Sequence, residues 1–181
     1  NNLSVYFCRM KINCTDEEVF IFKKISEAAE ELAMPAFIIG GFVRDKILNR
    51  KTKDADIVCI GDGIDLADKT ALKFSPKPAV SFFKNFGTAQ VKVFSNGSLF
   101  EIEFVGARKE SYNRSSRKPD VLRGSLDDDR MRRDFTINTL AAGLDKNNFL
   151  EVIDPLNGFE DIENKIIKTP LPPDQTFIDD P

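Results

Sequence analysis

Two aspartates spaced one residue apart at the end of an apolar run constrain this chain more than any other feature. Asp54 and Asp56 belong to the run Lys53-Asp54-Ala55-Asp56-Ile57-Val58. In a β-strand, side chains two residues apart point to the same face, so the two carboxylates are expected to lie together. Carboxylate oxygens are the ligands that hard divalent cations prefer. The pattern therefore predicts a strand over residues 55–60 that carries a metal site.

A glycine pair and an arginine precede this strand, in the run Gly40-Gly41-Phe42-Val43-Arg44-Asp45. A glycine turn that opens a helix favours phosphate binding, and the planar guanidinium of arginine donates hydrogen bonds to phosphate in pairs. The run has neither the GxGxxG nor the GxxxxGK[ST] pattern, which argues against a Rossmann dinucleotide site and a P-loop. A metal site beside a phosphate site indicates phosphoryl or nucleotidyl transfer.

Composition narrows the chemistry further, because the 181 residues include no histidine. Histidine-based acid–base catalysis, histidine-containing triads and histidine metal sites are thereby excluded, which leaves carboxylates, metal and arginines. The three cysteines form no CxxC pair, which predicts a reduced, cytoplasmic protein without a zinc site or disulfide framework. The net charge of −3 argues against a broad nucleic-acid surface but allows contact with one nucleic-acid end.

The order of apolar runs and turns predicts a single α+β domain with a mixed or mostly antiparallel sheet flanked by helices. Thr15-Asp16-Glu17-Glu18 has the form of a capping box, and apolar residues follow it at helical spacing over 16–33. Asn96-Gly97 predicts a hairpin turn. Further strands are expected at 36–39, 80–83, 88–94, 99–105 and 149–153, helices at 43–48, 66–74 and 127–140, and a last short element at 162–167.

Two segments are expected to lack regular structure. Residues 109–124 are polar and basic, with Arg114, Arg117 and Lys118 among them, and we expect a loop that is mobile or disordered without substrate. Residues 170–175 are rich in proline. No apolar run approaches the length of a membrane span, so no membrane contact is expected.

Taken together, the motifs resemble the catalytic head of class II tRNA nucleotidyltransferases (CCA-adding enzymes) and the related bacterial poly(A) polymerases, within the DNA polymerase beta-like nucleotidyltransferase superfamily. The resemblance extends from about residue 16 onward and depends on several motifs in the family's order. These motifs are Gly40-Gly41-Phe42-Val43-Arg44-Asp45, Asp54-Ala55-Asp56-Ile57-Val58, Phe86-Gly87-Thr88-Ala89-Gln90-Val91, Glu103-Phe104-Val105-Gly106-Ala107-Arg108 and Arg132-Arg133-Asp134-Phe135-Thr136-Ile137-Asn138.

The resemblance implies roles for particular residues. The aspartate pair and one further acid would bind two Mg²⁺ ions and act as the catalytic residues. The family's spacing to Arg108 selects Glu103 as that third acid, with Glu101 on the same strand face as the fallback. The other implied residues would bind the nucleotide or lie close to it: Gly40, Gly41, Arg44, Arg133, Asp134 and Asn138.

The implied reaction is metal-dependent transfer of nucleotidyl units from CTP and ATP to the 3′ end of tRNA, with release of pyrophosphate. The family continues into a neck, body and tail that read the incoming base and hold most of the tRNA. Residues 1–181 are therefore expected to form the head alone, with weak activity or none in isolation.

Several alternatives stay open. Bacterial poly(A) polymerases carry a histidine between the aspartate pair and the third acid, so its absence favours tRNA 3′-end synthesis over poly(A) synthesis. An A-adding or CC-adding enzyme is a further alternative within the family. Intact acids argue against a non-catalytic nucleotide-binding module, and the segment Arg132 to Asn138 fits a small-molecule nucleotidyltransferase poorly. The sequence predicts no oligomeric state.

Overall fold

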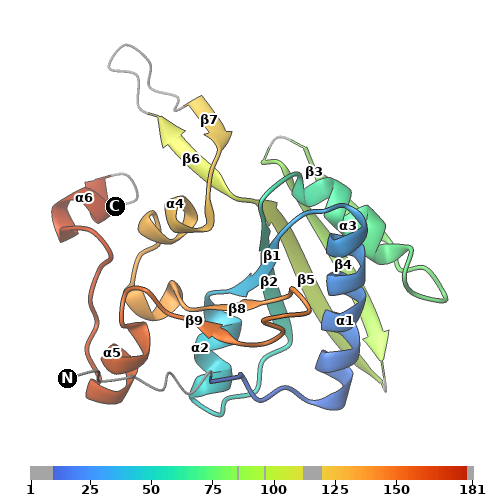
Figure 1. The fold of residues 1–181 in the computed structure, drawn as a ribbon, viewed down its shortest axis with the longest axis horizontal. Helices are drawn as coiled ribbons and strands as arrows, with labels where there is room; N and C mark the ends of the chain where they lie inside the picture. The colour runs from blue at the N-terminus through green and yellow to red at the C-terminus, as the bar shows by residue number, and fades with distance from the viewer. Residues whose placement is uncertain (1–9, 85, 96, 112–119, 179–181) are drawn as a thin grey trace, which may run out of the picture.

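The computed structural model describes residues 10–84, 86–95, 97–111 and 120–178. Its centre is a mixed sheet of seven strands in the order β3-β4-β5-β2-β1-β8-β9 (Figure 1). Every neighbouring pair is antiparallel except β2 and β5, which run parallel. The strands are β1 (Ala36–Ile39), β2 (Asp54–Cys59), β3 (Val80–Phe83), β4 (Thr88–Ser95), β5 (Ser98–Gly106), β8 (Ala141–Gly143) and β9 (Val152–Ile153). The α+β class predicted from the sequence is confirmed.

Helices α1 (Asp16–Glu31) and α3 (Gly63–Ala71) pack side by side and cover one face of this sheet (Figure 1). The capping box at Thr15 is present: the Glu18 backbone N–H donates to Thr15 Oγ1 at 3.3 Å, and the Thr15 N–H donates to Glu18 Oε2 at 2.7 Å. In the core beneath, Phe22 and Phe100 meet Phe42 of α2 (Gly41–Ile47) edge to face, with ring centroids 5.2 to 6.1 Å apart. This packing holds the glycine turn against the sheet.

The strand periodicity separates a buried face from an open one. Ala55 and Ile57 of β2 are buried in the core under the helices, whereas Asp54 and Asp56 alternate with them and are exposed. On β5, Ile102 and Phe104 are likewise fully buried. Because side chains alternate along a strand, the acidic residues between them lie on the opposite face. Helices α1 and α3 therefore cover the other face, and the acidic end of β2 stays exposed, whereas Val58 further along the same face is buried.

The single helix predicted over 127–140 is wrong. The chain forms α4 (Leu126–Met131), then a turn, then the 3₁₀ helix η1 (Thr136–Asn138), and continues into β8, a strand that was not predicted. Asp134 explains the break: its carboxylate accepts hydrogen bonds from the Phe135 backbone N–H at 2.7 Å and from Asn138 Nδ2 at 2.9 Å. Such local side-chain bonds compete with helical backbone bonds.

The segment 109–124 is also more ordered than expected at both ends. Strands β6 (Arg108–Ser111) and β7 (Asp120–Arg123) pair antiparallel in a hairpin that projects from the sheet (Figure 1). The Gly124 N–H donates to the Ala107 carbonyl at 2.9 Å and closes the hairpin at its base. The middle of the predicted loop, residues 112–119 with Arg114, Arg117 and Lys118, lies outside the described residues, and so do Asn96 and residues 179–181.

The C-terminal part differs from the expected positions of its elements. The last short element is α5 (Gly158–Asn164), slightly earlier than predicted, and the proline-rich stretch leads into a further helix, α6 (Pro173–Ile178). Proline is compatible with the first turn of a helix, where its missing N–H would have no helical partner. Within the described ranges, no helix is long and apolar enough to cross a membrane.

Candidate active site

The acidic side chains come together through the register of the parallel pair β2 and β5. Asp56 is opposite Glu103 and Asp54 is opposite Glu101. Neighbouring strands lie about 4.8 Å apart, so the opposed carboxylates are adjacent on the open face. The structure thus places Asp54, Asp56 and Glu103 on one face of the sheet as an acidic patch; their shared role in binding metal stays a prediction.

The neighbouring strand β4 distinguishes the two glutamates. Lys92 is opposite Glu101, and its Nζ lies 2.6 Å from Glu101 Oε1, whereas Glu103 is opposite the neutral Gln90. Glu101 is therefore paired with Lys92, whereas Glu103 lines the same pocket as Asp56. This arrangement supports Glu103 as the third acid.

An open pocket of about 540 Å³ lies over the acidic patch. It is lined by side chains of β2, β4 and β5, by two phenylalanines at the end of β3 and in the turn to β4, and by three arginines. The residues are, in that order, Asp56, Thr88, Gln90, Glu103 and Val105, then Phe83 and Phe86, then Arg108, Arg132 and Arg133. A pocket lined by both carboxylates and arginines suits a polyanion that is bound together with a metal ion.

Gly40 lies where the glycine turn meets this pocket. Its φ of 80° and ψ of −135° belong to a region that glycine occupies and other residues avoid. A Cβ atom at this position would lie 2.9 Å from Arg133 Nη1 and 3.7 Å from Asp56 Oδ2. The lack of a side chain at Gly40 therefore leaves room for the Arg133 guanidinium next to the Asp56 carboxylate.

Arg44, one helical turn after Gly40, is held by the segment that follows Arg133. Its Nη1 donates to Asn138 Oδ1 at 2.7 Å, and its Nε donates to Asp45 Oδ1 at 3.0 Å. Asn138 is oriented in turn by its bond to Asp134. The nucleotide-binding residues predicted from separate parts of the chain thus form one connected cluster beside the acidic patch.

Sequence reasoning missed Asp129, which positions the arginines. This carboxylate is 1% exposed and accepts from Arg133 Nη2 at 3.1 Å, Arg133 Nε at 3.2 Å and Arg132 Nε at 3.4 Å. The four-residue spacing from Asp129 to Arg133 is typical of an ion pair on one helix face and could have indicated it.

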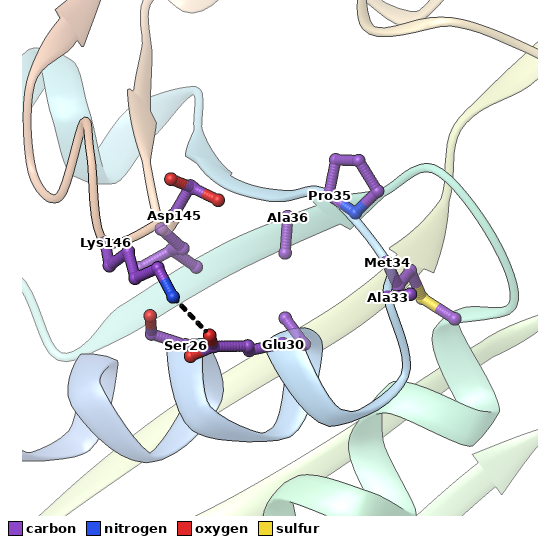
Figure 2. Close-up of a pocket in the computed structure, with 10 residues that line it drawn as sticks. Ser26, Glu30, Ala33, Met34, Pro35, Ala36, Asp145 and Lys146 are labelled. Atoms are coloured by element: carbon purple, nitrogen blue, oxygen red, sulfur yellow. Dashed lines mark hydrogen bonds and ion pairs between the residues drawn. The ribbon is translucent and has the colours of Figure 1, made fainter.

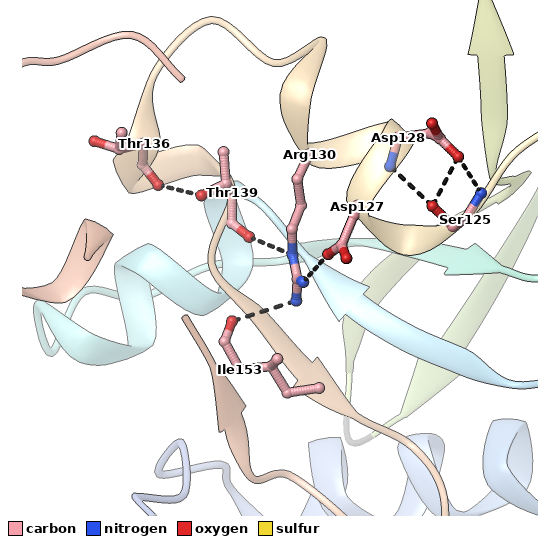
Figure 3. A network of polar contacts seen from close by, with 7 residues as sticks. All are labelled: Ser125, Asp127, Asp128, Arg130, Thr136, Thr139 and Ile153. Atoms are coloured by element: carbon pink, nitrogen blue, oxygen red, sulfur yellow. Dashed lines mark hydrogen bonds and ion pairs between the residues drawn. The ribbon is translucent and has the colours of Figure 1, made fainter. Parts of the chain in front are cut away.

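Sequence reasoning also missed Arg130, which anchors the same segment to the sheet (Figure 3). It is 3% exposed, and its guanidinium donates to the carbonyl of Thr139 at 3.2 Å, the carbonyl of Ile153 at 3.4 Å and Asp127 Oδ1 at 2.9 Å. Burial lowers the pKa of Arg130, and the neighbouring Asp127 raises it. Because a buried polar group needs partners, the bonds to Thr139 and Ile153 hold α4 against β9 and the chain that leads into β8, while the bond to Asp127 stays within α4.

The surroundings of the Asp56 carboxyl disfavour its ionised form. Although part of the side chain is exposed, the protein atoms packed around the carboxyl desolvate it and raise its pKa above the ordinary value; the charge of Arg133 lowers this pKa, and the nearby carboxylates of Glu103 and Asp54 raise it further. A bound cation would offset this mutual repulsion, and an all-oxygen donor set suits Mg²⁺. In the part of the chain that the structure describes, no three acidic, cysteine or histidine side chains are already close enough together to hold a metal ion.

A second pocket, of about 260 Å³, lies at the other end of β1, next to Pro35 and Ala36 (Figure 2). Its charged side chains are Glu30, Asp145 and Lys146, and Lys146 Nζ lies 2.6 Å from Glu30 Oε1. None of the acidic residues Asp54, Asp56 and Glu103 lines this second pocket, and neither do Arg108, Arg132 or Arg133. Asp56, Glu103 and Arg133 line the pocket of about 540 Å³ instead.

Comparison with known proteins agrees with this geometry. The sequence profile of the poly A polymerase head domain matches residues 36–168. The A-adding tRNA nucleotidyltransferase of Aquifex aeolicus is 38% identical over 146 residues, which cover 81% of this chain and 17% of that protein. The chain spans between 17% and 39% of the length of the A-adding relatives it matches.

Solved structures share the fold. A tRNA nucleotidyltransferase complexed with a primer tRNA and an incoming ATP analogue has a TM-score of 0.71 at 32% identity, with 87% of this chain and 41% of that chain covered. A complex of a CCA-adding enzyme with CTP has a TM-score of 0.75 at 27% identity, with 93% and 35% covered. These likenesses confirm the nucleotidyltransferase head fold expected from the motifs. The chain belongs to the poly A polymerase head domain family.

Proposed function

We propose that this chain is the catalytic head of an enzyme that transfers nucleotidyl units from CTP and ATP to the 3′ end of tRNA and releases pyrophosphate. The observation that carries the proposal is the register that places Asp56 opposite Glu103, in a pocket where Arg133 lies against Gly40. The similar proteins named above, with their bound CTP, ATP analogue and primer tRNA, support the choice of substrates.

In this proposal the arginines hold the triphosphate. Arg133 is fixed by Asp129 and Arg44 by Asn138, so both guanidinium groups are oriented before the ligand arrives. Phosphoryl-type transfer is accelerated mainly by positioning and by stabilising charge on the phosphate oxygens, which such preoriented donors supply. Gly40 and Gly41 contribute by the absence of side chains, which lets the triphosphate approach the backbone.

Asp54, Asp56 and Glu103 would hold two Mg²⁺ ions. When bound, the ions lower the pKa of the attacking 3′-hydroxyl and stabilise charge on the leaving pyrophosphate. The carboxylates themselves must be ionised to bind the ions, and Arg133 favours the ionised form of Asp56. The new bond joins the 3′-oxygen to the α-phosphorus as the bond from that phosphorus to the bridging oxygen breaks.

Addition of A alone is a second candidate, favoured by the names of the relatives that match most of this chain. The two candidates share the pocket and the metal chemistry. They differ in the acceptor, because an A-adding enzyme would extend a tRNA that already ends in CC, whereas a CCA-adding enzyme would also extend one that lacks all three nucleotides.

The first test is calorimetric titration of ATP and of CTP into this chain, with Mg²⁺ and with EDTA. We expect magnesium-dependent binding that is lost in the double variant Asp54→Ala/Asp56→Ala and kept in Asp65→Ala, a matched change at an exposed aspartate of α3. Binding that ignores magnesium and survives the double substitution would instead identify a non-catalytic nucleotide-binding module.

A further inference from the structure

We propose that Phe83 and Phe86 form the surface on which the terminal base of the acceptor RNA stacks. The inference depends on the proposed function and assigns a role to the run 86–91, which has none so far. Phe83 ends β3 and is 46% exposed, and Phe86, in the turn to β4, is 67% exposed. Both line the pocket that contains Asp56 and Glu103.

The strand order places these rings on the correct side for an acceptor. Along the sheet, β1 with the glycine turn is on one side of the acidic strands β2 and β5, and β4 and β3 are on the other. In an in-line displacement, the attacking and leaving oxygens lie on opposite sides of the transferred phosphorus. A triphosphate held beside Gly40 and Arg133 therefore requires the acceptor hydroxyl to approach from the β4–β3 side, where the two rings are.

The turn presents its aromatic rings together with a cation. The Phe86 N–H donates to the Phe83 carbonyl at 2.9 Å, which fixes the turn. A Cβ atom at Gly87 would lie 3.2 Å from Arg108 Nη2, so this guanidinium lies next to the same turn. Aromatic rings for the bases and a neighbouring arginine for the phosphates are the combination that binds single-stranded nucleic acid.

Stacking also matches what the reaction demands of the acceptor end. Every base has a flat face, so an aromatic surface tolerates any terminal nucleotide. An enzyme that extends the same RNA repeatedly meets a different last base after each addition. An aromatic surface holds each of these ends in the same place relative to Asp56 and Glu103.

Phe94 provides a matched control on the same strand. It is 78% exposed on β4, opposite Leu99, and its even-numbered position places it on the open face with Thr88 and Gln90. It does not line the pocket. Stacking at the pocket therefore predicts an effect for Phe86 and none for Phe94, although both are exposed phenylalanines.

The test uses a hairpin RNA with a single-stranded 3′ end whose last nucleotide is 2-aminopurine, a base whose fluorescence falls on stacking. The RNA is titrated with this chain in Mg²⁺. Phe86→Ala should weaken binding about 5- to 150-fold and abolish the quenching of the terminal base. Phe86→Trp should restore both, and Phe94→Ala should resemble the wild type. Thermal unfolding of each variant verifies that the fold is retained.

Two results would overturn the inference while leaving the proposed function intact. One is magnesium-dependent ATP binding by the wild type together with unchanged acceptor affinity and quenching in Phe86→Ala. The other is magnesium-dependent ATP binding together with an acceptor RNA that binds the wild type without quenching of its terminal 2-aminopurine. Absence of magnesium-dependent ATP and CTP binding in the wild type would refute the proposed function itself, and this stacking role with it.

Discussion

Replacing Gly40 with alanine should weaken triphosphate binding by far more than the accompanying loss of stability explains. Two effects arise from this substitution. The backbone has φ of 80° and ψ of −135°, where a residue with a Cβ atom is strained by about 1–3 kcal/mol. In addition, the new methyl group would lie 2.9 Å from Arg133 Nη1, so the guanidinium must move away from Asp56.

The two effects have different magnitudes and readouts. For a chain of this size, a loss of about 1–3 kcal/mol lowers Tm by about 2–12 °C. Displacing Arg133 removes a charge-assisted hydrogen bond to phosphate, worth about 1.5–3 kcal/mol, which corresponds to about a 10- to 150-fold loss of ATP affinity. Calorimetry in Mg²⁺ measures the affinity, and differential scanning calorimetry measures Tm.

Gly97 supplies the control, because its φ is 78° and a Cβ atom there would meet nothing within 4 Å. Gly97→Ala should lower Tm by a comparable amount, since the backbone cost is about 1–2 kcal/mol, and leave ATP affinity unchanged. If Gly40→Ala bound ATP as tightly as Gly97→Ala, the contact between Gly40 and Arg133 would have no part in nucleotide binding.

Three further substitutions test Glu103, the buried Arg130 and Asp56. Glu103→Gln should raise the magnesium concentration needed for half-maximal ATP binding by about 100-fold or more, whereas Glu101→Gln should change it by less than about fivefold; equal effects would refute the choice between them. Arg130→Met should lower the free energy of unfolding in urea by about 2–4 kcal/mol by leaving buried carbonyls unpaired, against about 0.5 kcal/mol or less for the exposed Arg50→Met. Burial and neighbouring carboxylates raise the pKa of Asp56 in the fold, so its contribution to stability is present below the ordinary aspartate pKa of about 4 and is lost as pH rises through the raised value. Asp56→Asn should therefore melt above the wild type at about pH 7 and together with it at about pH 3, and a lower Tm at neutral pH would contradict this sign.

Local features of the chain were predictable because they depend on neighbouring residues. The capping box at Thr15, the strand Ala36–Ile39 and the shared face of Asp54 and Asp56 all follow from patterns within a few positions. The break at Asp134 is also local, yet it was missed, because helical periodicity in the apolar residues around it concealed the side-chain bonds that end the helix.

The sequence by itself therefore determined most helices and strands up to residue 106, the shared face of the acidic side chains and the family of motifs, but not the break at Asp134, the hairpin of β6 and β7, β8 or α6. Only the tertiary structure decided which acids meet. A shift of two residues between β2 and β5 would leave every side chain on its own face and place Asp56 opposite Glu101 instead of Glu103. The approach of Gly40 to Arg133 and the hydrogen bond from Arg44 to Asn138 likewise join distant segments through packing. Such contacts depend on how the whole chain closes around its core, which no local pattern encodes.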